Sequence, residues 1–271
     1  MTISIITINR NNAAGLEKTM KSVFSQTWSN FEYVIVDGAS TDTSVGIIQR
    51  FAGLFGDRLR WVSEQDNGIY NAMNKGLKMA TGQYVEFLNS GDELASDKVV
   101  ENVMSVLNKN SFPTILYGNL IKTYKDKDGF RDRGFAGQDI SFLMFYKGTL
   151  NHPSAFIQKD LFKRYGDYDE SLKIVSDWKW FLQAIVFGDE RPFYADIDVV
   201  SFDMNGISES NKLLGEQERR SVLEQLVPKS ILVDYEKWFL SITQMRRLHR
   251  HPWAYKLVWL LERFLFKMEK R

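Results

Sequence analysis

The stretch that decides the fold runs Tyr84-Val85-Glu86-Phe87-Leu88-Asn89-Ser90-Gly91-Asp92-Glu93. Its first half is a mainly apolar run, typical of a strand buried in a parallel sheet. Its second half is a turn of small residues that ends in two carboxylates. Ligands of open α/β sheets bind just outside the carboxyl ends of the strands, where a carboxylate can hold a hard divalent cation against a diphosphate. A plain polar turn would use the same residues, so the chain upstream has to decide between the two interpretations.

Strands and helices alternate upstream of this stretch, with short connections. Strands are expected at residues 4–8, 32–36, 59–63 and 84–88, and helices at about 16–24, 47–51 and 69–79. This alternation is typical of βαβ units, which build a parallel sheet with helices on both faces. The sequence therefore predicts an α/β protein with a Rossmann-like, mostly parallel sheet.

The polar residues do not follow the Rossmann dinucleotide pattern. The first turn, residues 9–15, lacks a Gly-rich phosphate loop, and no P-loop lysine motif occurs in the chain. Polar groups instead follow the first, second and fourth strands. Asp37 ends the second strand, where its carboxylate could accept from a base imide or from ribose hydroxyls, or could cap the next turn.

The composition narrows the class of protein. The 271 residues suit one large domain, or a domain with an extension, and 44% hydrophobic residues can bury a substantial core. A net charge of +1 gives no signature of a nucleic-acid binder, so no nucleic-acid partner is expected. Without cysteines, disulfides and thiolate metal sites are excluded, and three scattered histidines do not suggest a zinc cluster.

The hydropathy of the chain bears on its location. The N-terminus enters a strand directly, without the pattern of a signal peptide, and no apolar stretch reaches the roughly 18 residues of a spanning helix. We expect a cytoplasmic protein, or one that lies peripherally on the cytosolic face of the inner membrane.

Several ordered motifs carry a resemblance. Residues 4–7 (Ser-Ile-Ile-Thr), 34–42 (Val-Ile-Val-Asp-Gly-Ala-Ser-Thr-Asp), 66–76 (Asp-Asn-Gly-Ile-Tyr-Asn-Ala-Met-Asn-Lys-Gly) and 80–82 (Ala-Thr-Gly) resemble family 2 glycosyltransferases. The resemblance runs to about residue 205. It implies the GT-A fold and an inverting transfer of a sugar from a nucleotide-diphosphate sugar, with UDP-sugars favoured, to a glycan or lipid-linked acceptor.

The resemblance also implies the domains and the donor site. Residues 1–205 would form the catalytic domain, with a nucleotide-sugar-binding half (1–95) and an acceptor-side half (96–205). Apart from the resemblance, the change in composition after residue 204 predicts a helical extension over residues 206–271. Asp37 would contact the base of the donor, and the segment from Asp66 to Lys75 would line the donor pocket, with Lys75 near the diphosphate. The donor-binding residues expected on this basis are Thr7, Asn9, Asp37, Asp66, Lys75 and Asn89.

The metal motif departs from the usual family pattern. Asp92 matches its last aspartate, but Asn89, Ser90 and Gly91 stand where the family commonly has further aspartates. A Mn²⁺ or Mg²⁺ ion tolerates one or two protein ligands when the diphosphate and water complete its shell, so we expect Asp92 to bind such an ion. The reduced motif lowers the expected affinity for the metal.

The second half of the chain contains the candidate general base. Apolar residues at 178, 181, 182 and 185 have helical spacing, which places Ser176 or Asp177 at a helix start, where a carboxylate also has a capping role. The family resemblance implies that Asp177 is the general base of the inverting reaction. His152 and Trp178 are acceptor-side candidates, although His152 would equally suit a hydrogen-bonded structural role.

The composition changes again near the C-terminus. Residues 246–271 contain eight Lys or Arg and two Glu, a net charge of +6, interleaved with Trp, Phe, Leu and Tyr. A basic helix rich in aromatic residues suits a membrane interface, which predicts peripheral membrane contact through 246–271. The alternative is a helix packed on the catalytic domain with its basic face in water.

Two other functions compete with glycosyl transfer. A degenerate family member could bind nucleotide sugars or act as a scaffold without turnover, which the reduced metal motif favours and the joint presence of Asp37, Asp92 and Asp177 opposes. A nucleotidyltransferase would share the sheet but needs an N-terminal Gly-rich basic loop, and that loop is missing.

Overall fold

The computed structural model describes residues 2–124, 129–203 and 211–269, and the chain divides into two compact units. The first unit runs from Met1 to Glu218 and the second from Arg219 to Arg271. The boundary expected from the sequence, between residues 205 and 206, lies outside the described residues. The first unit continues past it into helix α9 (Lys212–Leu226).

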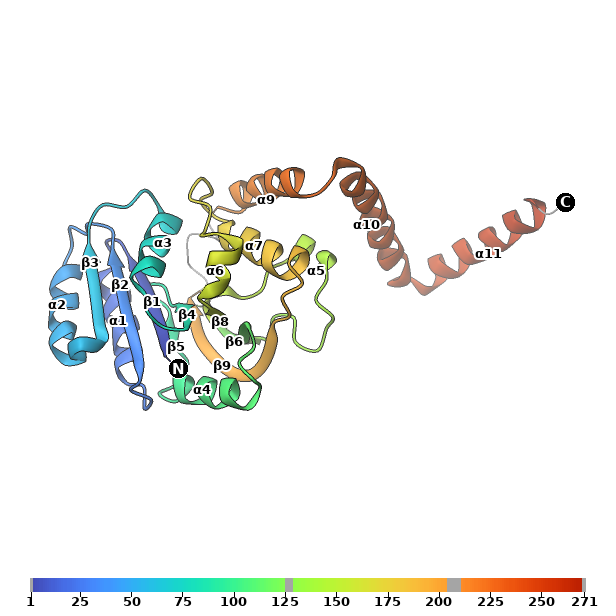
Figure 1. Cartoon of the computed structure of the whole chain (residues 1–271). Helices are drawn as coiled ribbons and strands as arrows, with labels where there is room; N and C mark the ends of the chain where they lie inside the picture. Colours follow the sequence, from blue (N-terminus) through green and yellow to red (C-terminus); the bar gives the residue numbers. More distant parts are fainter. Residues whose placement is uncertain (1, 125–128, 204–210, 270–271) are drawn as a thin grey trace. The chain divides into compact units, whose positions relative to one another are not determined.

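One mixed sheet forms the centre of the first unit (Figure 1). Its strands lie in the order β3 (Leu59–Ser63), β2 (Phe31–Asp37), β1 (Ile3–Asn9), β4 (Tyr84–Phe87), β8 (Ala155–Gln158), β6 (Ile115–Thr123), β9 (Phe193–Asp203) and β5 (Glu93–Leu94), with β7 (Phe130–Asp132) beside β6. The pairs among β3, β2, β1 and β4 are all parallel, which confirms the predicted βαβ half. In the second half β6 and β9 are parallel, whereas β8, β7 and β5 pair antiparallel.

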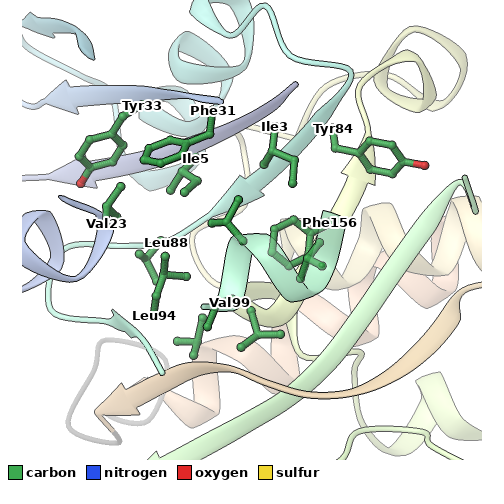
Figure 2. Packing of buried hydrophobic residues seen from close by; sticks show 14 of the residues in the cluster. Ile3, Ile5, Val23, Phe31, Tyr33, Tyr84, Leu88, Leu94, Val99 and Phe156 are labelled. Atoms are coloured by element: carbon green, nitrogen blue, oxygen red, sulfur yellow. The ribbon is translucent and has the colours of Figure 1, made fainter. Parts of the chain in front are cut away.

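Helices cover both faces of the parallel half. The helices α1 (Ala13–Phe24), α2 (Ser44–Phe55) and α4 (Val99–Lys109) bury apolar faces against a core that includes Ile3, Ile5, Tyr33 and Leu88 (Figure 2). Helix α3 (Ile69–Met79) packs on the opposite face of β1 and β2. Because side chains alternate along a strand, Ile5 belongs to the first core while Ile6 meets α3.

A glycine sets the close approach of α3 to the sheet. A Cβ on Gly76 would overlap Cγ2 of Ile6 and would also touch Cγ2 of Val36. Both strand residues are fully buried, so they have little room to move. Gly76 therefore fixes the distance between α3 and the strands that carry the candidate site.

The second half of the unit adds shorter helices, α5 (Phe142–Lys147), α6 (Asp160–Tyr165) and α7 (Ser176–Phe181), the last continuing as a π-helical turn over Leu182–Phe187. The strands β6 and β7 pair antiparallel, and the residues that connect them, 125–128, lie outside the described residues. The two-residue strand β5 pairs with β9, Leu94 opposite Val200, so the turn after β4 is tied to a strand more than a hundred residues later.

The second unit contains the end of α9 and the helices α10 (Lys229–His249) and α11 (Pro252–Glu269). Large apolar side chains of α11 are exposed, among them Trp253, Leu257, Leu260, Leu261 and Leu265. Among the described helices, none combines the length and the apolar character needed to cross a bilayer.

Candidate functional site

A row of hydrogen bonds joins the carboxyl ends of four neighbouring strands. Asn9, Asp37 and Ser63 are the last residues of β1, β2 and β3 and lie side by side in register. The Asn9 amide donates to Oδ1 of Asp37 at 2.8 Å, and the Ser63 hydroxyl donates to Oδ2 at 2.6 Å. On the other side, the Ser90 hydroxyl, just after β4, donates to Oδ1 of Asn9 at 2.8 Å. The polar residues that the sequence placed after separate strands thus form one continuous edge.

The carboxylate of Asp37 accepts hydrogen bonds at both of its oxygens. Besides Asn9 and Ser63, it accepts from the backbone N–H of Ser40 (2.9 Å) and from the Ser40 hydroxyl (2.5 Å). Burial by itself would raise the pKa of Asp37, but these hydrogen bonds outweigh it and hold the pKa below its ordinary value. A carboxylate offers about four acceptor positions, so Asp37 in this arrangement organises the strand ends and the turn after β2, the capping role left open by the sequence.

Asp66 lies against the same turn. A Cβ on Gly38 would overlap Oδ2 of Asp66 and would come within 3.3 Å of Arg10 Cδ, so only glycine allows this approach. Oδ1 of Asp66 accepts from the backbone N–H of Gly68 at 3.0 Å, just before α3 begins. Lys75, expected near a diphosphate, pairs with Glu64 at 2.7 Å and donates to the Gln65 carbonyl at 2.8 Å.

The turn after β4 presents Asn89 and Asp92. The backbone of this turn is held by Thr19, whose hydroxyl donates to the Asp92 carbonyl at 2.7 Å. Asp92 is buried, and Oδ1 of Asn89 is buried without a hydrogen-bond partner among the described residues. Glu93 forms an ion pair with Lys18 at 2.7 Å, so its carboxylate is not a second candidate metal ligand beside Asp92. A carboxylate and an unpartnered amide oxygen three residues apart are hard oxygen ligands of the kind that Mg²⁺ and Mn²⁺ bind.

Glu86, in the middle of the deciding stretch, is fully buried within the sheet. Neither of its carboxyl oxygens has a hydrogen-bond partner among the described residues. Burial, and then the charge of Asp92, raise the pKa of Glu86 well above its ordinary value, which favours the neutral form of the group. No pattern in the sequence separates this residue from the apolar run around it.

Thr7 occupies the interior rather than the edge. Its hydroxyl donates to the Leu88 carbonyl at 2.7 Å, lies 3.0 Å from the Tyr33 hydroxyl, and is fully buried. Thr7 therefore joins β1 to the end of β4, and its side chain offers no exposed atom to a donor, in contrast to the donor contact expected from the sequence.

Asp177 lies in the first turn of α7 and is half-buried. Its Oδ1 accepts from the Tyr70 hydroxyl at 2.8 Å, and helix α7 has no side-chain cap. Asp177 thus does not take the capping role that the sequence left open. Tyr70 lies in the first turn of α3, only four residues after Asp66, so one helix start connects Asp177 with the edge of the strand-end row.

The two acceptor-side candidates are buried. His152 stacks on Phe87 with ring centroids 5.2 Å apart, and its Nε2 lies 2.7 Å from the Tyr168 hydroxyl. Burial lowers the pKa of His152, which favours the neutral form of the ring. The Trp178 indole donates to the Phe145 carbonyl at 2.9 Å from the core. Both side chains therefore pack in the core, Trp178 on the apolar face of α7 and His152 against Phe87 of β4. These packing roles stand in place of the acceptor contact expected from the sequence.

The hydrogen-bond partners of these groups were not among the residues predicted for the site. Ser40, Ser63 and Ser90 bind the strand-end residues, and Tyr70 binds Asp177 across 107 positions of the chain. Serines in turns are too common to signal a site, and no local pattern pairs a tyrosine with an aspartate so far along the chain.

A parallel half with polar strand ends, followed by a mixed half that contributes a further carboxylate, is the GT-A architecture, and solved structures agree. Staphylococcus aureus TarS 1–349 in complex with UDP-GlcNAc matches with a TM-score of 0.63 and 18% identity over 78% of this chain and 61% of that chain. The mannosyltransferase PcManGT from Pyrobaculum calidifontis, in complex with GDP-Man and Mn²⁺, matches with a TM-score of 0.61 and 18% identity, over 83% of this chain and 64% of that one. These likenesses establish the fold.

The sequence comparisons establish the family. Residues 4–166 match the Glycosyl transferase family 2 domain. A PGL/p-HBAD biosynthesis glycosyltransferase of Mycobacterium bovis is 32% identical over 181 residues, 67% of this chain and 68% of the relative. An uncharacterized glycosyltransferase of Mycobacterium tuberculosis is 28% identical over 231 residues, 84% of this chain and 86% of the relative. The chain belongs to glycosyl transferase family 2, and it is a transferase enzyme.

Proposed function

We propose that the protein is an inverting glycosyltransferase that moves a sugar from a nucleotide-diphosphate sugar to a hydroxyl of a glycan or lipid-linked acceptor, with Asp177 as the general base. The observation that carries the proposal is the hydrogen bonding of the Asp177 carboxylate. One of its oxygens is fixed by Tyr70, and Oδ2 receives no hydrogen bond from the described part of the chain. A half-exposed carboxylate in this state is suited to accept a proton from a substrate hydroxyl.

The proposed step is a single displacement at the anomeric carbon. The acceptor hydroxyl oxygen attacks C1 of the sugar from the face opposite the diphosphate, while its proton passes to the carboxylate of Asp177. The C1–O bond to the diphosphate breaks, and the nucleoside diphosphate leaves with the electron pair. One bond forms as one breaks, so the configuration at C1 inverts.

The donor side of the proposal uses the strand-end row and its neighbours. Asn9 and Asp37 order the turn after β2, and Asp66 closes on that turn at Gly38, so the base and ribose would lie against this edge. The solved relatives in complex with UDP-GlcNAc or GDP-Man support a nucleotide sugar as the ligand. Lys75 would reach a diphosphate after exchanging its ion pair with Glu64. We favour UDP-sugars as donors.

A divalent cation fits the turn after β4 when the donor brings part of its shell. No group of three His, Cys, Asp or Glu capable of holding a metal is found within residues 2–124, 129–203 and 211–269. Asp92 and the unpartnered amide oxygen of Asn89 would hold Mn²⁺ or Mg²⁺. Such an ion would neutralise charge on the departing diphosphate, while Asn9 and Ser90 keep the neighbouring strand end in place.

Thermal shift with UDP-, GDP- and TDP-sugars, each with and without Mn²⁺, tests the donor. Release of nucleoside diphosphate from the stabilising sugar, with water as the acceptor, tests turnover, and the anomeric configuration of the first-formed product, read by NMR, tests inversion. Asp177→Asn should lower the rate about 10²–10⁴-fold at unchanged donor affinity. Binding without release in the wild type would favour the degenerate nucleotide-sugar binder, and retained configuration would refute the single displacement.

We also propose that helix α11 contacts the membrane at which the enzyme binds its acceptor. Helix α11 exposes Trp253, Leu257 and Leu261 together with Lys256 and Arg263, an arrangement suited to the headgroup region of an anionic membrane at the cytosolic face. Each basic residue near such a surface contributes about 1 kcal/mol. Peripheral contact through this helix would bring the enzyme to a lipid-linked acceptor.

Vesicle flotation tests the membrane contact. Full-length protein should float with vesicles that contain phosphatidylserine at low salt, and less with pure phosphatidylcholine or at high salt. The double variant Trp253→Ser, Leu257→Ser should stay at the bottom of the gradient. Leu54→Ser, which changes an equally exposed leucine of α2, is the matched control. Equal flotation of the double variant and the control would remove α11 from the membrane contact.

A further inference from the structure

The segment that carries the chain into α7 has no regular structure. Residues 166–175 form turns and bends between α6 and α7, with no helix or strand of their own. The position of the Asp177 carboxylate therefore depends on the contacts that hold this segment. Some come from α7 itself, such as the ion pair of Lys179 with Asp169, and others come from two elements in distant parts of the chain.

Helix α3 holds the segment from one side. The Asn74 side chain pairs with the backbone of Tyr168 in both directions, donating to its carbonyl at 2.9 Å and accepting from its N–H at 3.0 Å. Asn71 and Asn74 both donate to the carboxylate of Glu170, at 2.7 and 2.8 Å. One turn earlier, the Tyr70 hydroxyl lies 2.8 Å from both the Ile174 carbonyl and Oδ1 of Asp177.

Helix α9 holds the same segment through a single carboxylate. Glu218 accepts from three consecutive backbone N–H groups, those of Lys173 at 2.8 Å, Ile174 at 2.9 Å and Val175 at 3.3 Å. These are the last residues before α7 begins. Because both oxygens of Glu218 are used, the carboxylate restrains the backbone in position and in orientation.

We propose that Tyr70 and Glu218 are positioning residues for the general base: Glu218 fixes the backbone that enters α7, and Tyr70 fixes Oδ1 so that Oδ2 faces the acceptor hydroxyl. The inference rests on the proposed role of Asp177. Neither residue touches the substrate in this scheme, and both act through Asp177.

The Tyr70 hydroxyl suits both protonation states of the base. It has one proton and two acceptors at equal distance, the Ile174 carbonyl and Oδ1 of Asp177. With Asp177 ionised, the stronger charge-assisted bond draws the proton to the carboxylate. After Asp177 has taken the acceptor's proton, the Tyr70 proton can turn to Ile174. The hydroxyl therefore steadies the carboxyl group before and after the transfer without leaving its place.

Tyr70 remains a neutral donor throughout this cycle. Burial, and then the charge of Asp177, raise the pKa of Tyr70 well above its ordinary value. The charge of Asp177 also acts to raise the pKa of His152 and of Tyr168, which lie in the interior of the second half. Of these three residues, Tyr70 makes the direct hydrogen bond.

The test compares four single variants by release of nucleoside diphosphate, with water as the acceptor. Tyr70→Phe and Glu218→Gln remove the proposed contacts. Tyr84→Phe removes a buried hydroxyl that donates to Pro113, and Glu216→Gln changes an exposed carboxylate of α9. We expect kcat to fall about 10–100-fold in the first two, because a misplacement of about 1 Å costs about 10²-fold. Donor affinity should stay within about twofold, and the controls should match the wild type.

The pH profile separates positioning from general destabilisation. Without the Tyr70 hydroxyl the charged form of the base is less favoured, so the acidic limb of the kcat profile of Tyr70→Phe should move to higher pH. Tyr84→Phe should leave that limb in place even if its melting temperature falls equally. Unchanged kcat and unchanged limbs in both Tyr70→Phe and Glu218→Gln, with Asp177→Asn inactive, would overturn the positioning role alone. Wild-type rates in Asp177→Asn would overturn the proposed base itself.

Discussion

Replacing Asp37 with Asn tests whether this carboxylate organises the strand ends. Two donors face each of its oxygens, Asn9 and Ser40 at Oδ1, and Ser40 and Ser63 at Oδ2. An amide keeps one oxygen and puts an NH₂ group at the other position. In either orientation one N–H donor, from Asn9 or from the Ser40 backbone, then faces the new NH₂ and loses its partner, while a serine hydroxyl can turn and accept.

The magnitude follows from these bonds. An orphaned buried donor costs about 1–3 kcal/mol, and two bonds that lose the charge of their acceptor weaken by about 1 kcal/mol each. We expect a loss of about 3–5 kcal/mol in the free energy of unfolding, which for a unit of this size lowers Tm by roughly 10 °C. Thermal melts followed by near-UV circular dichroism measure the change, with the exposed Asp57→Asn as control.

The effect of Asp37→Asn on Tm should depend on pH. Because the pKa of Asp37 lies below its ordinary value of 3.8, its stabilising contribution is present in full above that value and is lost as the pH falls through the lowered pKa. The difference in Tm between wild type and Asp37→Asn should therefore hold steady from pH 7 to 5 and narrow in stronger acid. A difference under about 2 °C at pH 7, or one that widens toward acid, would refute the described bonding.

Three further changes address the turn after β4, the packing of α3 and the buried carboxyl. Asp92→Ala should abolish the Mn²⁺-dependent part of nucleotide affinity in calorimetry while leaving Tm nearly unchanged, and an unaltered manganese effect would exclude Asp92 as a ligand. Gly76→Ala should destabilise by about 1–2 kcal/mol in urea unfolding because overpacking against Ile6 exceeds the gain in helix propensity, whereas Gly53→Ala, whose new methyl meets open space, should stabilise by about 0.5–1 kcal/mol. Glu86→Gln should raise Tm, and by more as the pH rises above 4.5, the ordinary pKa of the carboxyl. The wild-type protein loses stability as the pH rises from the pKa of Glu86 in the unfolded chain toward its raised pKa in the folded protein. A difference in Tm that stays constant with pH would mean that Glu86 is ionised throughout.

Local periodicity was sufficient for the parallel half of the fold. The strand over Leu59–Ser63 and the helix over Ile69–Met79 have the predicted bounds, and β1 and β2 each extend one residue further at both ends than predicted. These elements bury continuous or helical apolar patterns within short segments, which is the information that a sequence displays directly.

The site was less predictable because its contacts are not local. Asp37 is bonded by Asn9 and Ser63, 28 and 26 positions away, so its saturation cannot be read from its own strand. Trp178 was expected on the acceptor side, although the helical spacing that it shares with Phe181, Leu182 and Ile185 favours the core, where the structure places it. The strand β5 has only two residues, too few for any period to appear.

The pairing of β5 with β9 has a consequence for the order in which the protein is made. The contacts among β1, β2, β3 and β4 involve only the first 87 residues, so this half can assemble as soon as those residues have left the ribosome. The turn that holds Asp92 is different, because β5 at its far end is held early by α1 but gains its strand partner only when Val200 and Ser201 arrive. Closing that long loop is a late and slow event. A nascent chain would thus complete the Asn9–Asp37–Ser63 edge well before β5, next to the turn proposed to carry the metal, was paired with β9.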